Sequence, residues 1–339
     1  MPGGWQEQVV DRARAALPAT VFDYVTVGAG DGVSAAEAGW SDVRFAPHVL
    51  RDVRDVDLSG RLLASDVAAP WGVAPTSLLR AVHPEGELAM AAACVDAGVP
   101  LVVSSNAGVS FESIGATGVA WWLQLYLPAD RTLAVPLLQK AVEAGAQAVV
   151  LTVDTPVVAS KRVEVSVWHE LDPGLVRVNF EPGYELAAGA EKALDLGPGD
   201  LTWLAGQTGL PVVVKGVLRA DDARRSVEAG AAAVWVSNHG GRQLDRAVTT
   251  RSALPAVVAE IGDEVPVLVD GGIRAGLDVL AALSLGASGV FLGRLPTLAL
   301  VDGAAGVTSL LHRLRTETVE AFRLAGCRRV SDAPEIAAQ

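Results

Sequence analysis

The chain has 339 residues, of which 50% are hydrophobic and 19% are charged, and its formal net charge is −12. Such a composition is typical of a folded chain with one large core, and the acidic balance disfavours nucleic acid or an anionic membrane as a partner. The two cysteines, Cys94 and Cys327, fit no metal or disulfide framework, so we expect reduced, buried thiols. Neither a secretory signal nor an apolar run of about 20 residues is visible in the sequence, which predicts a soluble, cytoplasmic protein.

Residues 1–69 precede the first predicted barrel strand and contain a helical stretch, Trp5–Leu17, and a glycine-rich turn, Gly28–Gly32. Beyond them, short apolar runs alternate with alanine-rich amphipathic segments. The runs are typical of strands buried on both faces, and they are Pro70–Ala74, Leu101–Ser104, Trp121–Tyr126, Ala148–Val153, Val212–Lys215, Ala233–Ser237, Val265–Asp270 and Gly289–Gly293. The predicted helices are Pro84–Ala97, Asp130–Ala144, Ala220–Ala229, Arg251–Ile261, Gly276–Leu285 and Gly303–Leu324.

Eight strands that alternate with helices predict an α/β fold, namely a (β/α)8 TIM barrel that forms one domain over residues 1–339. The rival, a doubly wound sheet, requires a GxGxxG turn directly after the first strand, and the sequence has none there. Residues 157–200 form a long fourth connection that Pro173, Gly174 and Pro182 interrupt. Because long loops in compact domains are usually lids or binding loops, we expect a lid here.

Polar residues stand at the carboxyl end of every predicted strand. They are Thr76, Ser104, Gln124 with Tyr126, Thr152 with Asp154, Lys215, Ser237 with His239, Asp270, and Arg294. In a barrel these strand ends meet at one mouth, where active sites lie. A single polar residue there can simply mark the point where polarity resumes, but the whole set indicates a site.

Two of these residues indicate acid–base chemistry. Lys215 is one of four lysines; it either meets an anion in the barrel mouth or extends to solvent. His239 is followed by Gly240 and Gly241, and it is either a structural histidine or a general base whose basicity Asp154 would raise. Arg242 is a candidate for bidentate binding of a substrate carboxylate.

The last two strand ends combine flexible backbone N–H donors with arginines. They read Asp270-Gly271-Gly272 with Arg274, and Gly293 with Arg294. Loops after strands seven and eight often bind phosphate in barrels. Pyridoxal phosphate would suit a lysine and a phosphate site, but a base beside a carboxylate site favours flavin mononucleotide (FMN).

The segment Ser237–Asp245 (SNHGGRQLD) resembles the signature of the FMN-dependent α-hydroxy acid oxidase and dehydrogenase family, which includes glycolate oxidase, lactate oxidase and mandelate dehydrogenase. The resemblance covers roughly residues 10–330. It includes the companion motifs Phe22–Tyr24, Gly28-Ala29, Ala74–Thr76, His83–Gly86, Gln124–Tyr126, Thr152–Pro156, Val214–Gly216, Asp270–Gly272 and Gly293-Arg294.

The resemblance implies a role for each matched residue. His239 would take a proton from the substrate as the Cα hydrogen leaves for flavin N5, Asp154 would hold the imidazolium, and Lys215 would stabilise negative charge at flavin N1 and C2=O. Tyr24 and Arg242 would bind the substrate carboxylate, and Tyr126 the substrate oxygen. The remaining cofactor contacts would come from Ala74, Pro75, Thr76, Ser104, Gln124, Thr152, Ser237, Asp270, Gly271, Gly272, Arg274, Gly293 and Arg294.

Departures from the family pattern bear on the substrate. Lys161 stands where members usually have a second carboxylate-binding arginine, and either Lys161 or its neighbour Arg162 would serve here. Asn106 replaces a bulky tryptophan of glycolate oxidases, Val158 is modest in size, and the fourth loop is about a dozen residues shorter than usual. A shortened lid and a wide pocket predict a bulky, aryl 2-hydroxy acid such as mandelate.

The resemblance has two further implications. Oxygen or another acceptor would reoxidise the flavin, and the family suggests a homotetramer. Two alternatives stay open: oxidation of a peptide-derived or amine substrate in a biosynthetic pathway, and a catalytically idle flavin barrel.

Overall fold

The structure is a computed structural model that describes residues 4–30, 32–161, 166–169 and 172–338. Its centre is a closed barrel of eight parallel strands, in which the last strand pairs with the first. The strands in barrel order are β3 (Trp71–Val73), β4 (Leu101–Ser104), β5 (Trp121–Leu125), β6 (Val149–Thr152), β7 (Val212–Val217), β8 (Ala233–Val236), β9 (Val267–Val269) and β10 (Gly289–Leu292). The predicted (β/α)8 barrel is therefore confirmed, and the doubly wound alternative is wrong.

Seven of the eight apolar runs contain one of these strands, and the eighth covers the first four residues of β7, because a strand covered on both faces needs apolar side chains on both. The largest difference is at β7, which continues past Lys215 to Val217. The pairing of β7 with β8 shifts between Lys215 and Val217, where Gly216 has a φ of 113°. A side chain at Gly216 would collide with Asp154 on the neighbouring strand end, so this glycine lets two site-bearing strands approach closely.

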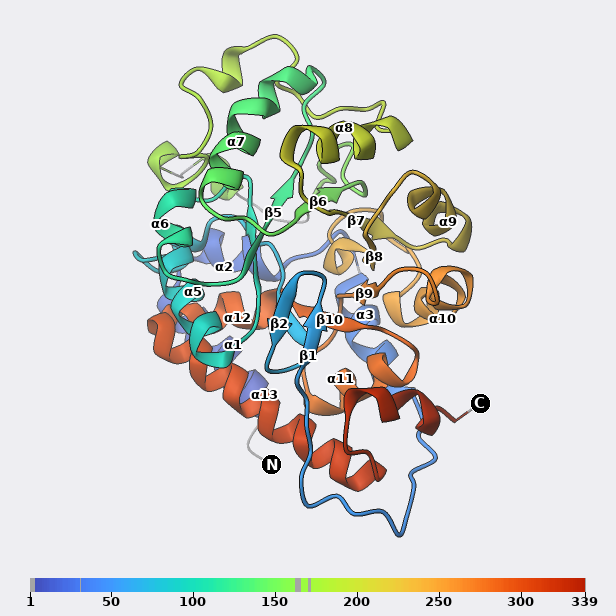
Figure 1. Cartoon of the computed structure of the whole chain (residues 1–339). Coiled ribbons are helices and arrows are strands. Elements are labelled where there is room, and N and C mark those ends of the chain that lie inside the picture. Colours follow the sequence, from blue (N-terminus) through green and yellow to red (C-terminus); the bar gives the residue numbers. More distant parts are fainter. Residues whose placement is uncertain (1–3, 31, 162–165, 170–171, 339) are drawn as a thin grey trace.

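Helices surround the barrel (Figure 1). Those that follow barrel strands are α4 (Leu79–Val82), α5 (Glu87–Ala97), α6 (Phe111–Gly115), α7 (Val135–Glu143), α8 (Pro198–Thr208), α9 (Ala220–Glu228), α10 (Thr250–Ile261), α11 (Gly276–Ser284), α12 (Arg294–Ala299) and α13 (Gly303–Ala325). The 3₁₀ turns are Arg131–Ala134, Val167–His169, Pro173–Leu175, Tyr184–Leu186, His239–Gly241, Leu300–Asp302 and Val330–Ile336. The six helices predicted in the barrel region correspond to α5, α7, α9, α10, α11 and α13.

The N-terminal extension holds α1 (Trp5–Ala16), α2 (Ala19–Thr26) and α3 (Gly32–Ser41). The first is the predicted helix, whereas the other two were not predicted. The α2 segment is rich in β-branched and aromatic residues, which have low helix propensity, and it is helical because Val21 and Val25 are buried against the barrel core. Tertiary packing overrides local preference here, and it places Tyr24 near the barrel mouth.

A hairpin closes the opposite end of the barrel. Its strands are β1 (Gly60–Leu62) and β2 (Ser65–Val67). Leu62 and Val67 are buried in the barrel interior with residues of the strands, and the Trp122 indole near the start of β5 donates a hydrogen bond to the Ser65 hydroxyl (3.3 Å). Because the hairpin covers that end, the barrel is open at the carboxyl ends of its strands.

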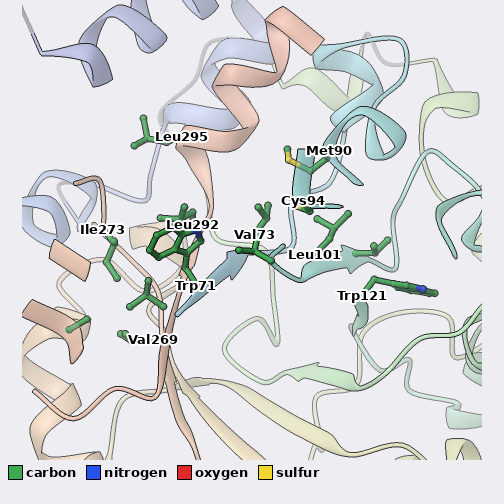
Figure 2. Packing of buried hydrophobic residues seen from close by; sticks show 14 of the residues in the cluster. Trp71, Val73, Met90, Cys94, Leu101, Trp121, Val269, Ile273, Leu292 and Leu295 are labelled. Atoms are coloured by element: carbon green, nitrogen blue, oxygen red, sulfur yellow. The ribbon is translucent and has the colours of Figure 1, made fainter. Parts of the chain in front are cut away.

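The main hydrophobic core lies between the strands and the surrounding helices. Figure 2 shows Met90 and Cys94 of α5 beside Val73 and Leu101 of the adjacent strands. Cys94 and Cys327 are both buried free thiols, as predicted. No helix in the described ranges is long and apolar enough to span a membrane.

In its described residues the fourth connection is largely irregular and carries three short 3₁₀ turns before α8 begins at Pro198. Proline is well tolerated at the first position of a helix, and Asp200 caps this one by accepting a hydrogen bond from the Gly197 amide (2.8 Å). In Figure 1 the connection extends outward beyond α7. Part of it reaches the N-terminal extension, since the ring of Trp168 packs edge-on against Tyr24 with centroids 5.9 Å apart.

Candidate active site

A cavity of about 1010 Å³, part of it open to solvent, lies at the carboxyl ends of the strands. Most of the predicted site residues line it: Tyr24, Ala74, Pro75, Thr76, Ser104, Gln124, Tyr126, Thr152, Lys215, His239, Arg242, Asp270, Gly271, Gly272, Arg274, Gly293 and Arg294. These residues come from all eight strand ends or the loops after them, and from α2. The closed barrel thus brings distant parts of the chain to one mouth.

His239 lies at the cavity and is bonded to a carboxylate behind it. Its Nδ1 lies 3.0 Å from Asp154 Oδ1, and the Thr155 hydroxyl donates to the same carboxylate oxygen (3.0 Å). Burial by itself raises the pKa of Asp154. The combined opposite effect of His239, Lys215 and Thr155 is larger, so the net pKa lies below the usual value. An ionised aspartate on Nδ1 orients the ring and stabilises its protonated form.

The backbone around His239 is held in an unusual conformation. His239, Gly240 and Gly241 have φ values of 56°, 62° and 72°, and a non-glycine residue in this region is uncommon. The His239 amide donates to the Ser237 hydroxyl (3.1 Å). Such local strain is typical of functional sites, where surrounding contacts fix it.

Lys215 forms a buried network with Ser237 and Asp270. Its ammonium lies 3.1 Å from Asp270 Oδ2 and 2.9 Å from the Ser237 hydroxyl, which in turn donates to Asp270 Oδ1 (2.6 Å). Lys215 is only 4% exposed. Ser237 therefore lies behind the cavity wall and holds the lysine that lines it, so the predicted alternative of a solvent-directed lysine is wrong.

Three residues form a site suited to a carboxylate and a hydroxyl. One guanidinium nitrogen of Arg242 donates to the backbone carbonyls of Tyr24 (2.6 Å) and Val27 (3.0 Å), and the guanidinium lies 5.0 Å from the centre of the Tyr24 ring. Burial raises the pKa of both Tyr24 and Tyr126. Both phenols therefore stay protonated at neutral pH and can donate hydrogen bonds.

Two arginines and an accessible stretch of backbone lie at the β9–β10 end of the cavity. Arg294 donates to the Gly240 carbonyl (2.5 Å) and the Val25 carbonyl (3.2 Å), while Arg274 pairs with Glu37 of α3. Burial, and then the charges of Arg242 and Arg274, lower the pKa of Arg294 to about 10, so it remains cationic at neutral pH. A Cβ added at Gly293 would meet no atom of the described residues within 4 Å, which leaves its backbone accessible to an anion.

The wall between these two ends is neutral and polar. The Gln124 side-chain amide donates to the Thr152 hydroxyl (3.0 Å), and the Ser104 and Ser77 hydroxyls lie 3.0 Å apart. Phe291 lines the bottom of the cavity and packs on Trp235, with ring centroids 4.1 Å apart. A planar heterocycle with carbonyl and N–H groups suits such a wall, and a phosphate suits the arginine end. The residues present therefore fit FMN: Lys215 would lie beside the ring, and Arg274 and Arg294 would hold the phosphate.

Some predicted substrate-binding residues lie outside the cavity. Val158 is 72% exposed, the side-chain oxygen of Asn106 accepts from Arg177 (3.1 Å), and Lys161 donates to the carbonyls of Ala159 (2.9 Å) and Arg242. Lys161 is thus adjacent to the carboxylate site without lining the cavity. Arg162 lies outside the described residues.

Several residues that line the cavity were not predicted to belong to the site, namely Val25, Glu37, Ser77, Ile273, Phe291 and Leu295. Thr155, which contacts Asp154 and lies 3.3 Å from His239 Nδ1, was not predicted either. Ser77 and Thr155 directly follow predicted site residues, so their position in the sequence could have indicated that they belong to the site. No local pattern indicated Glu37, because its contact with Arg274 joins positions 237 residues apart.

A family model described as FMN-dependent dehydrogenase matches residues 13–338. Glycolate oxidase 3 of Arabidopsis thaliana is 40% identical over 334 residues, which cover 93% of this chain and 90% of that protein. The 4-hydroxymandelate oxidase of Amycolatopsis orientalis is 40% identical over 337 residues, which cover 95% and 94%. A structure of mandelate oxidase with (S)-4-hydroxymandelic acid superposes with a TM-score of 0.91 at 37% identity, covering 98% of this chain and 97% of that one.

Proposed function

Since this chain belongs to the FMN-dependent dehydrogenase family, we propose that it oxidises 2-hydroxy acids to 2-keto acids and that its preferred substrates carry a bulky, aryl side chain. The predicted family and the predicted cofactor, FMN, are confirmed. When bound, FMN accepts the electrons that leave the substrate carbon. The other tasks fall to side chains of this chain.

The observation that carries the proposal is the His239–Asp154 pair, whose Nδ1 and Oδ1 lie 3.0 Å apart; His239 lines the cavity together with Arg242, Tyr24 and Tyr126. Arg242 and Tyr24 bind the substrate carboxylate, which fixes the hydroxyl-bearing carbon. His239 takes the hydroxyl proton, and Asp154 stabilises the charge that the ring gains. Tyr126 donates a hydrogen bond to the substrate oxygen.

Two facts support the aryl preference. Among the similar proteins are a 4-hydroxymandelate oxidase and a mandelate oxidase, both named for aryl substrates. In this chain the Asn106 side chain is bound to Arg177 and does not line the cavity. A small residue held in this way leaves space for a substrate ring.

The carboxylate site also separates the alternatives. An amine substrate without a carboxylate would leave the guanidinium of Arg242 without an anionic partner. A catalytically idle barrel does not require a histidine paired with an ionised aspartate. Three expectations stay predictions: the electron acceptor, whether oxygen or another molecule, the homotetramer, and the cytoplasmic location.

The test is anaerobic reduction of the FMN-loaded protein, followed as bleaching of the flavin absorbance. Mandelate should bleach the flavin at least about tenfold faster than glycolate or lactate, the effect of about 1–3 kcal/mol of side-chain burial. Mandelamide, which lacks the carboxylate charge, is the matched control and should react poorly. Comparable rates with glycolate and mandelate would contradict the aryl preference, and a flavin that no 2-hydroxy acid bleaches would contradict the function itself.

A further inference from the structure

One buried hydroxyl contacts each of the groups that handle the substrate proton. Thr155 is buried, and its side-chain oxygen lies 3.0 Å from Asp154 Oδ1 and 3.3 Å from His239 Nδ1. It is also within hydrogen-bonding reach of the Tyr126 phenol. These residues follow three different barrel strands, β5, β6 and β8. Thr155 does not line the cavity, so it can act on the reaction only through these neighbours.

The Thr155 hydroxyl has one proton, and the carboxylate receives it. Thr155 Oγ1 is closer to Asp154 Oδ1 than to His239 Nδ1, and a hydroxyl bonds more strongly to an ionised oxygen than to a neutral nitrogen. Since an ionised carboxylate can only accept, we assign the ring proton to Nδ1, which lies 3.0 Å from the same Oδ1. This assignment leaves Nε2 of His239 as the nitrogen that accepts the substrate proton.

Two donors therefore share a single oxygen of Asp154. The other oxygen, Oδ2, is buried, and no residue in the described ranges donates a hydrogen bond to it. Lys215 acts on Asp154 through its charge, but its ammonium is paired with Asp270 instead. Among the described side chains, Thr155 and His239 are thus the two that share the negative charge of Asp154 by direct contact.

A carboxylate without a second donor would hold the histidine more firmly in its protonated form. A desolvated negative charge beside an imidazole favours the imidazolium, and a ring that is protonated before the substrate binds cannot accept a proton from it. A hydrogen bond from a neutral hydroxyl disperses part of that charge. The hydroxyl of Thr155 therefore weakens the attraction between Asp154 and the imidazolium, by an amount on the order of one hydrogen bond.

We propose that Thr155 is a positioning residue that limits how firmly Asp154 holds the protonated form of His239, so that the ring is free to accept the substrate proton at neutral pH. This inference rests on the proposed function, because that function makes His239 the base. It adds a residue whose hydroxyl acts on proton transfer without contacting the substrate.

A competing explanation is that the Thr155 hydroxyl only satisfies local hydrogen bonds after β6. The two explanations differ in what its loss does. A purely structural hydroxyl contributes to stability, so its loss changes the free energy of unfolding or slows the reaction by the same factor at every pH. A hydroxyl that shares the charge of Asp154 changes the pH at which His239 can act as a base.

The other charged and titratable groups around the pair are unchanged in a variant that lacks the hydroxyl. They are Lys215 of β7, Tyr126 after β5, Tyr24 of α2, Arg242 after β8 and Lys192 of loop 4. Lys192 belongs to loop 4, here residues 157–200, and its Nζ lies 3.8 Å from the centre of the Tyr126 ring. Burial raises the pKa of Tyr126 and lowers that of Lys192 to about 8, so neither titrates at the acidic end of the range. A displaced acidic limb therefore arises at Asp154 and His239.

The experiment measures the pH dependence of anaerobic flavin reduction by mandelate in the FMN-loaded protein, between about pH 5 and about pH 8. Reduction slows at the acidic end as His239 becomes protonated. Thr155→Val and Thr155→Ala, which both lack the hydroxyl, should move this acidic limb upward by about half to one pH unit, the equivalent of one hydrogen bond. Thr155→Ser should keep the wild-type profile. Thr318→Val, the matched control, removes another buried hydroxyl, which donates to the Leu314 carbonyl on α13, and it should leave the profile unchanged.

A second measurement needs no turnover. In protein that carries isotope-labelled histidine and oxidised FMN, NMR signals of the ring report the pH at which His239 becomes protonated, and His239→Ala identifies them among the five histidines. Thr155→Val should raise that pH by the same amount. An unchanged or lowered pH, or slower reduction without a displaced limb, would overturn the proposal. If no 2-hydroxy acid reduces the flavin but the titration still moves, the proposed function is wrong and the influence of Thr155 on His239 stands.

Discussion

The two sides of the cavity are built by different means. On the β7–β9 side, the buried side chains of Lys215 in β7, and of Ser237 and Asp270 directly after β8 and β9, bond one another. On the loop-4 side, Lys161 and Lys192 are long side chains held by backbone carbonyls and by an aromatic face. The first side is a closed network, whereas the second has cations with little direct compensation.

This difference separates chemistry from substrate choice. Groups that move a proton must be fixed closely, and rigid strands achieve that better than loops. Groups that recognise a variable side chain can lie on a connection whose sequence changes without disturbing the barrel. We therefore expect substitutions on the strand side to affect all substrates or the fold, and those on loop 4 to affect selectivity and pH dependence.

The largest expected effect is the loss of the base on the strand side. His239→Ala should keep bound FMN but slow anaerobic flavin reduction by about 10²- to 10⁴-fold with every 2-hydroxy acid, since a general base contributes on this scale. Stopped-flow reduction checks the rate, and the flavin spectrum checks loading. Reduction at the wild-type rate would place the base elsewhere and remove the distinction between the two sides.

Next is Lys215→Met, which tests whether the strand-side network is closed. It leaves Asp270 as a buried charge without its cation, and breaking a buried pair costs about 3–5 kcal/mol. Chemical denaturation of the cofactor-free protein should show this loss. The double variant Lys215→Met with Asp270→Asn should recover much of it, and a single variant as stable as wild type would show that the pair contributes nothing.

Arg242 lies between the two sides, because it follows β8 but contacts α2. Arg242→Lys keeps the charge and loses the planar pair of donors, so substrate binding should weaken by about 1–3 kcal/mol, or about five- to a hundredfold. Benzoylformate titration of the oxidised flavin measures this. Weakened binding of mandelamide by the same factor would contradict a role in carboxylate binding.

The features predicted correctly from the sequence have local physical causes. A strand buried on both faces requires an unbroken apolar run, so all eight barrel strands were visible. In the closed barrel, Asp154 and His239 stand at the ends of separate strands, and their pairing followed once the barrel was assumed. The family resemblance assigned roles within that arrangement but not the contacts.

The features that were missed depend on tertiary contacts. The α2 helix forms against its own propensity because the barrel buries Val21 and Val25, and the sequence around Glu37 contains nothing that points to Arg274. Lys192 lies in a connection without periodicity, so no pattern predicted that it would pack on Tyr126. The conformation of a loop depends on the residues that it packs against, and a local sequence pattern does not identify those residues.

The smallest expected effect concerns Lys161 and the pH. Burial, and then the charge of Arg242, lower the pKa of Lys161 to about 8, so Lys161 is cationic below that pH and loses its charge as the pH rises through it. Benzoylformate affinity should therefore fall by about fivefold, or about 1 kcal/mol, between about pH 7 and about pH 9.5. Lys161→Arg, which stays charged throughout this range, should abolish the fall, whereas Lys140→Arg on α7 should not. The same fall in Lys161→Arg as in wild type would show that the pH dependence arises elsewhere, and that this loop-4 lysine does not act on the carboxylate.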